Sequence, residues 1–242
     1  MKVVVGVIVI WFSSLFAHEL LGQQVQSNTL TNRGTPAVSD KEKKRLAEIR
    51  AGAERGEAKA QNDLGWLLHD GLLGLEKDYA QAVSWFRKAA DQAYPPAWCN
   101  LGLCYAEGKG VNQDYAEAIK WFRKAAEQDH TGGQYNLGLC YAKGRGVKED
   151  FTMAAQLFRK AAEKGQAKAQ NNLGYCYNHG LGVPTNAIAA LKWFTLSANQ
   201  GDEVAKRAMN SLERGLSAEE VAKGRELARN FKPVASAGTR RP

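Results

Sequence analysis

Two twelve-residue segments of this 242-residue chain are nearly identical. "NLGLCYAEGKGV" begins at residue 100 and "NLGLCYAKGRGV" begins at residue 136, an offset of 36 residues. The Leu-Gly pair inside them recurs elsewhere, and the full series is Leu64, Leu101, Leu137 and Leu173. Self-similarity at a period of roughly 20–50 residues indicates an array of stacked structural repeats.

Each unit is predicted to form two helices joined by a glycine loop. In the second unit Ala97, Leu101 and Cys104 follow helical spacing. Gly108 and Gly110 then indicate a helix C-terminus and a turn. The second helix of every unit follows a strong N-cap residue, and these residues are Asp78, Asp114, Asp150 and Asn186.

One such pair of helices cannot bury its apolar face alone, but stacked pairs share a continuous core. The sequence therefore predicts an all-α fold, a right-handed α-α superhelix with about ten helices. Its four repeats span about 57–93, 94–129, 130–165 and 166–201 within a solenoid of residues 41–231. A more polar helix at 44–58 and a segment at 202–231 are the expected caps, the latter with a capping box at Ser217–Glu220.

The first residues differ in composition from the repeats. Lys2 is followed by an apolar run over residues 3–17, which is typical of a signal peptide at residues 1–22, cleaved after Ala17 or Gly22. An uncleaved membrane anchor is the alternative. Residues 23–40 are predicted to be a disordered spacer and residues 232–242 a basic tail. The expected location is therefore periplasmic or secreted, or membrane-anchored in the alternative case.

The repeated motif is Ala-x-x-x-Leu-Gly-x-x-Tyr-x-x-Gly-x-Gly-Val, followed by Asp and then Ala-x-x-Trp-x-x-x-Ala-Ala. It resembles the Sel-1-like repeat family, a relative of the tetratricopeptide repeats, over residues 58–201. The resemblance implies an adaptor or scaffold role in protein complexes, often at membranes or in bacterial envelopes. It does not imply one particular partner.

Catalytic, metal and cofactor sites are not expected. The glycine loops follow helices, whereas a dinucleotide fingerprint must follow a strand. The histidines at 69, 130 and 179 are predicted to be solvated. Cys104, Cys140 and Cys176 recur at one repeat position, too far apart on packed helices to bridge, and are predicted to be small buried apolar groups. Cysteine-rich members of the family pair cysteines within a unit, but the candidate partner positions here carry alanine, as at 125–126.

A ladder of basic pairs repeats along the second helices, at 87–88, 123–124 and 159–160. A solvated outer face is one interpretation, and contact with an anionic lipid surface or acidic partner is the other. The chain has a net charge of +8, but the ladder lacks interleaved aromatic residues for base stacking. Nucleic acid is therefore not an expected partner.

The family resemblance further implies that the first helices line a concave groove. The residue that directly follows each Leu-Gly pair should face this groove. These residues are Trp66, Leu103, Leu139 and Tyr175. The residues preceding each Leu include Tyr135 and a ladder of three asparagines, Asn100, Asn136 and Asn172. Aromatic anchors and amide groups suit an extended peptide. Bracing of neighbouring repeats by the asparagines and core packing of the aromatics stay open as alternatives.

The sequence thus predicts a non-catalytic, exported scaffold that binds a protein or peptide in its groove. Two other functions stay open. One is a small-ligand-binding or weakly hydrolytic protein like the cysteine-rich relatives, and the other is docking of the basic face on an anionic membrane.

Overall fold

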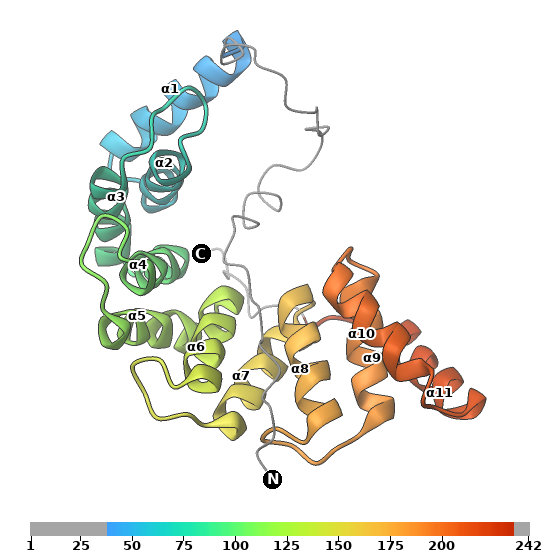
Figure 1. Cartoon of the computed structure of the whole chain (residues 1–242). Coiled ribbons are helices and arrows are strands. Elements are labelled where there is room, and N and C mark those ends of the chain that lie inside the picture. Colours follow the sequence, from blue (N-terminus) through green and yellow to red (C-terminus); the bar gives the residue numbers. More distant parts are fainter. Residues whose placement is uncertain (1–37, 235–242) are drawn as a thin grey trace, which may run out of the picture. The chain divides into compact units, whose positions relative to one another are not determined.

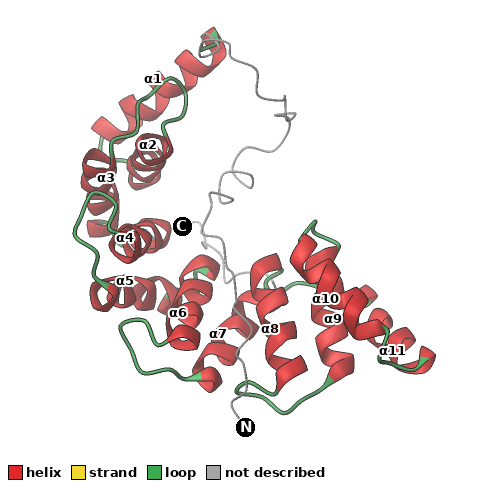
Figure 2. Cartoon of the chain, viewed as in Figure 1, coloured by secondary structure: helices red, strands yellow, loops and turns green. Residues whose placement is uncertain are grey.

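The computed structural model describes residues 38–234, which form eleven α-helices and no strand (Figures 1 and 2). The helices are α1 (Asp40–Glu54), α2 (Ala58–Asp70), α3 (Tyr79–Asp91), α4 (Pro95–Glu107), α5 (Tyr115–Glu127), α6 (Thr131–Lys143), α7 (Phe151–Glu163), α8 (Ala167–His179), α9 (Ala187–Ala198), α10 (Glu203–Glu213) and α11 (Ala218–Arg229). The predicted signal peptide or anchor at 1–22, the spacer up to residue 37, and the tail beyond 234 lie outside the described residues.

The helices between α2 and α9 form four pairs, α2–α3, α4–α5, α6–α7 and α8–α9, and each pair packs on the next. The helix α4 also contacts both α2 and α6, so the first helices of successive repeats line one side of the array, here called the inner face. The second helices lie on the opposite, outer face (Figure 1). The prediction of an all-α repeat superhelix is confirmed, with eleven helices where about ten were expected.

The predicted helix ends are confirmed. The side chains of Asp78, Asp114, Asp150 and Asn186 each accept a hydrogen bond from the backbone N–H three residues later. Gly71, Gly108, Gly144 and Gly180 end the first helices in the left-handed conformation. These local signals stop each helix at the same repeat position, so the repeats keep one register along the array.

The glycine of each Leu-Gly pair is explained by an aromatic ring on the facing helix. A Cβ atom on Gly102 would lie 2.5 Å from Cδ1 of Phe122, closer than any normal contact. The same pairing recurs as Gly65–Phe86, Gly138–Phe158 and Gly174–Phe194. All four rings are buried. Each repeat is therefore closed by one phenylalanine packed against a glycine backbone.

The glycine loops bind the preceding repeat. Gly146 lies so close to the start of α5, the outer helix of the preceding repeat, that a Cβ atom on it would be 2.8 Å from the Tyr115 carbonyl carbon. The loop cations stack on the same residues: Lys109 lies over the Tyr79 ring and Arg145 over the Tyr115 ring, each 5.5 Å from the centroid. The loops are turns within each repeat, as predicted, and their glycines permit close approach to the backbone of the preceding repeat.

The two ends of the array are capped differently. The helix α1 begins with a capping box at Ser39 and packs on α2. At the other end both α10 and α11 pack on α9, and α11 begins with the predicted capping box at Ser217. Gly224 of α11 faces Leu191 of α9, and Arg225 forms two hydrogen bonds of 2.8 Å to the Glu213 carboxylate. The last helix therefore folds back over the final repeat.

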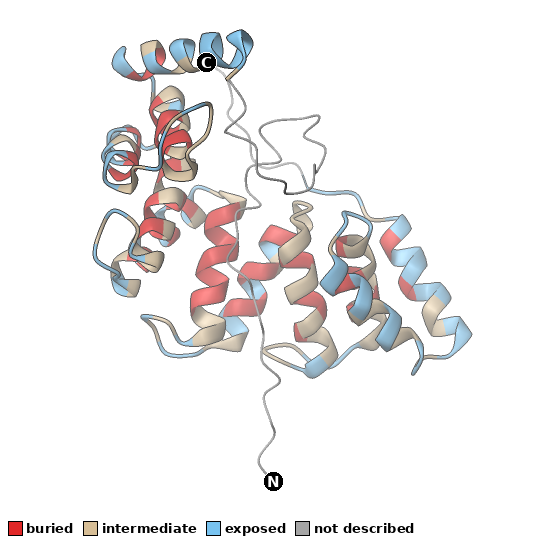
Figure 3. Ribbon diagram, turned by 45° about the horizontal axis from the view of Figure 1, so that its top comes forward, coloured by how far each residue is buried: buried red, intermediate tan, exposed pale blue. Residues whose placement is uncertain are grey.

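Burial is greatest in the middle of the array. Nine consecutive residues of α6, from Gly132 to Cys140, are buried, whereas α1 and α11 are largely exposed (Figure 3). None of the described helices combines the length and apolar character needed to cross a bilayer.

Candidate interaction surface

The predicted groove residues lie on the first helices of the repeats, but they differ in exposure. Trp66, Leu103 and Tyr175 are half-buried. Each packs against a cluster of buried apolar side chains in the core of the array. Leu139 and Tyr135 of α6 are each 5% exposed and offer little area to a partner. The inner face thus carries accessible apolar groups on α2, α4 and α8, with an interruption at α6.

The three asparagines connect neighbouring repeats. The Asn100 amide donates to Oδ1 of Asn62 at 2.9 Å, and the Asn136 amide donates to Sγ of Cys99 at 3.6 Å. Burial raises the pKa of Tyr135, and an interaction of its hydroxyl with the Asn172 side chain lowers it in part. Asn62, Cys99 and Tyr135 occupy one repeat position, so each contact joins a repeat to the next.

This pattern supports the bracing interpretation of the asparagine ladder. Each amide keeps further hydrogen-bonding capacity, since one carbonyl oxygen accepts two bonds and the nitrogen donates two. Peptide recognition by Asn100, Asn136 and Asn172 stays a prediction. What the structure establishes is that their positions are fixed by neighbouring side chains.

A second hydrogen-bond series was not anticipated. Gln61 donates to the Ala53 carbonyl at 3.3 Å, Gln170 to the Ala162 carbonyl at 3.1 Å, and the indole of Trp98 to the Ala90 carbonyl at 3.0 Å. All three donors stand three residues before the repeat leucine and reach the carbonyl eight residues back. The recurrence of glutamine at 61, 134 and 170 was the available sequence signal. These bonds hold the inner helices against the preceding outer helices.

All four cysteines of the chain lie in the described region as free, buried thiols. Burial raises the pKa of Cys99 and Cys104 to about 12, and that of Cys140 and Cys176 to about 11. Such thiols stay protonated at neutral pH and are poor nucleophiles. The interpretation of these residues as small buried apolar groups is confirmed.

The prediction that the histidines are solvated is wrong for His130. This residue is largely buried at the junction between the second and third repeats, where its Nδ1 accepts a 3.2 Å hydrogen bond from the Gly133 N–H and caps α6. Burial, together with the positive charge of Lys164, lowers the pKa of His130 to about 4. The cause is its position before α6, where it lies beside Gly132 and Gly133, which have no Cβ atom, and near Lys164 of the outer helix end. His69 is also enclosed, and its Nδ1 lies 2.6 Å from Asp70 Oδ1.

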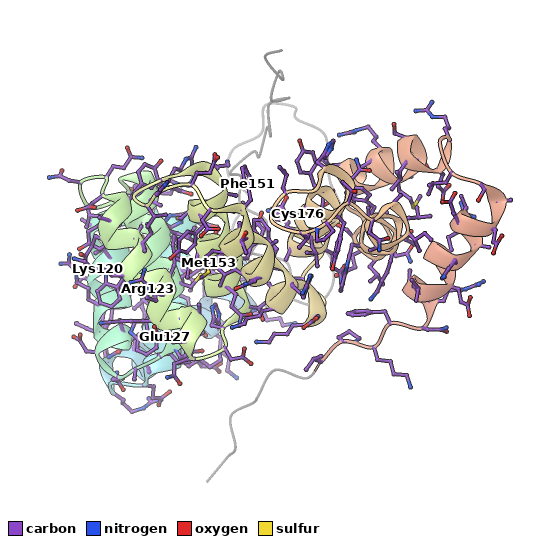
Figure 4. All side chains as sticks on the ribbon, turned by 90° about the horizontal axis from the view of Figure 1, so that it is seen from below. Lys120, Arg123, Glu127, Phe151, Met153 and Cys176 are labelled. Atoms are coloured by element: carbon purple, nitrogen blue, oxygen red, sulfur yellow. The ribbon has the colours of Figure 1, made fainter. Side chains whose placement is uncertain are left out.

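The basic ladder lies on the outer face, and four of its six cations contact aromatic side chains. Lys88 lies 3.8 Å from the Trp85 ring centroid and Lys124 lies 4.5 Å from that of Trp121. Arg87 and Arg159 donate to the hydroxyls of Tyr105 and Tyr177. Figure 4 shows Lys120, Arg123 and Glu127 of α5 on this face, so acidic groups interrupt the positive charge. Within residues 38–234, no three His, Cys, Asp or Glu side chains are placed to share a metal ion.

Comparison with known proteins places this architecture in context. The family model described as Sel1 repeat matches residues 58–94, 95–130, 132–166 and 167–202. The structure is similar to the crystal structure of c5321, a protective antigen present in uropathogenic Escherichia coli strains and displaying an SLR fold. The two chains have 36% sequence identity and a TM-score of 0.72. The match covers 78% of this chain and 40% of that chain.

Two further proteins are similar. A Sel1 repeat protein from Oxalobacter formigenes has 33% identity and a TM-score of 0.63, over 71% of this chain and 49% of its own. HRD3A of Arabidopsis thaliana, an ERAD-associated E3 ubiquitin-protein ligase component, is 34% identical over 88 residues, 36% of this chain and 13% of HRD3A. This chain therefore spans less than half the length of each of these three proteins.

Proposed function

We propose, on the premise that this chain belongs to the Sel1 repeat family, that it is a non-catalytic scaffold which binds a protein or peptide on its inner face. Sel1 repeat proteins generally mediate protein–protein interaction, and HRD3A is by name a component of a larger assembly.

The observation that carries the proposal is the set of half-buried apolar side chains on three of the four inner helices, Trp66 on α2, Leu103 on α4 and Tyr175 on α8. Large side chains that remain partly exposed on an otherwise packed surface are the usual anchors of protein interfaces. The asparagine and glutamine bonds between repeats hold the backbone beneath these anchors. A partner would therefore meet a surface that is already ordered, which lowers the entropic cost of binding.

The direct test replaces Trp66, Leu103 and Tyr175 together by serine. We expect in-cell crosslinking followed by affinity capture and mass spectrometry to show at least a tenfold loss of the main partner. Far-ultraviolet circular dichroism should remain that of wild type, because none of the three side chains is fully buried. Loss of helicity would assign them to the core instead.

A matched control removes three exposed cations of the outer face: Lys120, Arg123 and Lys160, each replaced by serine. The proposal requires that this variant keep the partner. If it alone loses the partner, or loses binding to anionic vesicles while the inner-face variant is unaffected, the function resides in the basic outer face.

Export is the second part of the proposal, and it rests on Lys2 and the apolar run at residues 3–17. Mass spectrometry of the mature protein from fractionated cells tests it. A new N-terminus after Ala17 or Gly22 in the soluble exported fraction would support cleavage, whereas an intact N-terminus in the membrane fraction would support an anchor.

A further inference from the structure

A short segment after α11 occupies a notch on the outer face of the fourth repeat. The Phe231 ring meets the Trp193 ring edge to face, with centroids 5.5 Å apart and an interplanar angle of 72°. Pro233 lies 3.6 Å from the Cβ position of Gly165. The backbone N–H of Val234 donates to the Glu163 carbonyl, at the end of α7, at 2.8 Å. Residues 231–234 are therefore held by one aromatic contact, one proline contact and one backbone hydrogen bond, as a short peptide ligand would be.

Three features of the protein make this notch. The first is a tryptophan on the outer helix, with the ammonium group of Lys192 4.2 Å from its ring centroid. The second is a glycine in the left-handed conformation between repeats, Gly165 with φ 92°. The third is the Glu163 carbonyl at the end of the preceding outer helix, which accepts the hydrogen bond from Val234. Because the chain is a repeat array, each feature has counterparts in the other repeats.

The first repeat has the ring, the glycine and the carbonyl, with its cation at a different sequence position. Trp85 occupies the position of Trp193 and is half-buried. Ser84 replaces Lys192, but Lys88, one helical turn after the ring, lies 3.8 Å from its centroid. Gly56 occupies the position of Gly165, with φ 89° and nothing within 4 Å of its Cβ position. No backbone N–H among residues 38–234 donates to the carbonyl of Glu54, the counterpart of Glu163.

The other two repeats match less well. In the second repeat, Ala93 stands where glycine is needed, so a methyl group projects toward the place of the proline ring. In the third repeat, Leu157 replaces the tryptophan, and Asp129, which replaces the glycine, forms an ion pair with Lys164. Among the three other described repeats, the first is therefore the one that combines the ring, the glycine and the carbonyl.

We propose that the notch formed by Trp85, Gly56 and the Glu54 carbonyl binds an extended segment of a partner protein with the pattern Phe-x-Pro-apolar. The phenylalanine meets the tryptophan edge to face, a favoured aromatic geometry, beside the Lys88 cation. The proline packs on the glycine and stiffens the segment, and the next residue's N–H satisfies the helix carbonyl. This site is on the outer face and is separate from the proposed inner-face function.

The test uses a fluorescent peptide with the sequence of residues 229–236, RNFKPVAS, titrated into the full chain and followed by fluorescence anisotropy. We expect saturable binding of one peptide per chain. Trp85→Leu should weaken it at least tenfold, and this variant is structurally conservative because the third repeat has leucine at the equivalent position. A peptide with alanine in place of phenylalanine should bind at least tenfold more weakly to wild type.

Trp193→Leu is the matched control, because it alters the notch that the chain's own segment fills. The proposal requires that this variant bind the peptide as well as wild type or better. If Trp193→Leu abolishes binding and Trp85→Leu does not, the peptide only exchanges with residues 231–234, and the proposal is overturned. Absence of saturable binding, or equal binding to wild type and folded Trp85→Leu, also overturns it.

Discussion

Replacing Phe122 by alanine is expected to lower the free energy of unfolding by about 3–5 kcal/mol, the usual loss for a fully buried phenylalanine. Phe122 is 2% exposed, and its ring fills the space over Gly102 between α4 and α5. The neighbouring backbone is held by inter-repeat contacts, so the cavity cannot collapse freely. Urea unfolding followed by circular dichroism measures the loss.

A double-mutant cycle with Gly102 tests the stated cause. Gly102→Ala alone should cost about 1–3 kcal/mol, because its Cβ would lie 2.5 Å from the ring. In the Phe122→Ala background the same methyl group enters the vacated space, so the double variant should lose less stability than the two single losses combined. Additive losses would show that Gly102 and Phe122 do not pack against each other as described.

Stability is expected to fall by about 2 kcal/mol between pH 7.5 and pH 5 because of His130. The pKa of His130 is about 4 in the folded chain, below its usual value of 6.5. Between these values the unfolded chain binds more protons than the folded chain. The contribution of His130 is therefore fully present above pH 6.5 and is lost progressively as the pH falls toward 4. Urea midpoints measured across this range report it.

His130→Asn isolates this effect, since asparagine can cap α6 but does not titrate in this range. Lys164 and Asp129 are the charged groups at the same junction, and both remain in the variant. The difference in unfolding free energy between wild type and His130→Asn should shift with pH by about 2 kcal/mol, in favour of the variant at pH 5. A difference that stays constant with pH would mean that the imidazole is solvated.

The period of the sequence predicts most of this fold for a physical reason. Helix ends depend on local signals such as Asp114 and Gly108, and those signals repeat every 36 residues or so. The packing of Phe122 on Gly102 follows the same period, so one correctly assigned unit predicts the others. The all-α class and the loops could be predicted in this way. The first cap lies outside the period, and its helix, expected at 44–58, spans Asp40–Glu54.

The features that escaped prediction depend on contacts between repeats. The bond from Asn136 to Cys99 joins residues 37 positions apart, and no property of either residue alone indicates it. His130 occupies a position that carries Glu57, Tyr94 and Gln166 in other repeats, so its enclosure is not visible from residue type. The exposure of groove positions also varies, because Leu139 lies in the most deeply buried inner helix.

The C-terminal segment escaped prediction for a different reason. Lys232 begins a tail that appears polar and terminal in the sequence, yet residues 231–234 contact α7 and α9. The contact is made by one aromatic ring, one proline and one backbone N–H, which is too little to create a periodic pattern. Only the placement of Trp193 and Gly165 beside the segment shows that it has a binding site.

The complete burial of residues 132–140 in α6 has a consequence for the motions of the array. In a linear stack, an end unit can open by breaking one interface, whereas a central unit can open only by breaking two. The amide protons of α6 should therefore exchange with solvent most slowly, and protection should decrease toward α1 and α11. Local opening would then release the ends of the inner face first while its centre remains ordered.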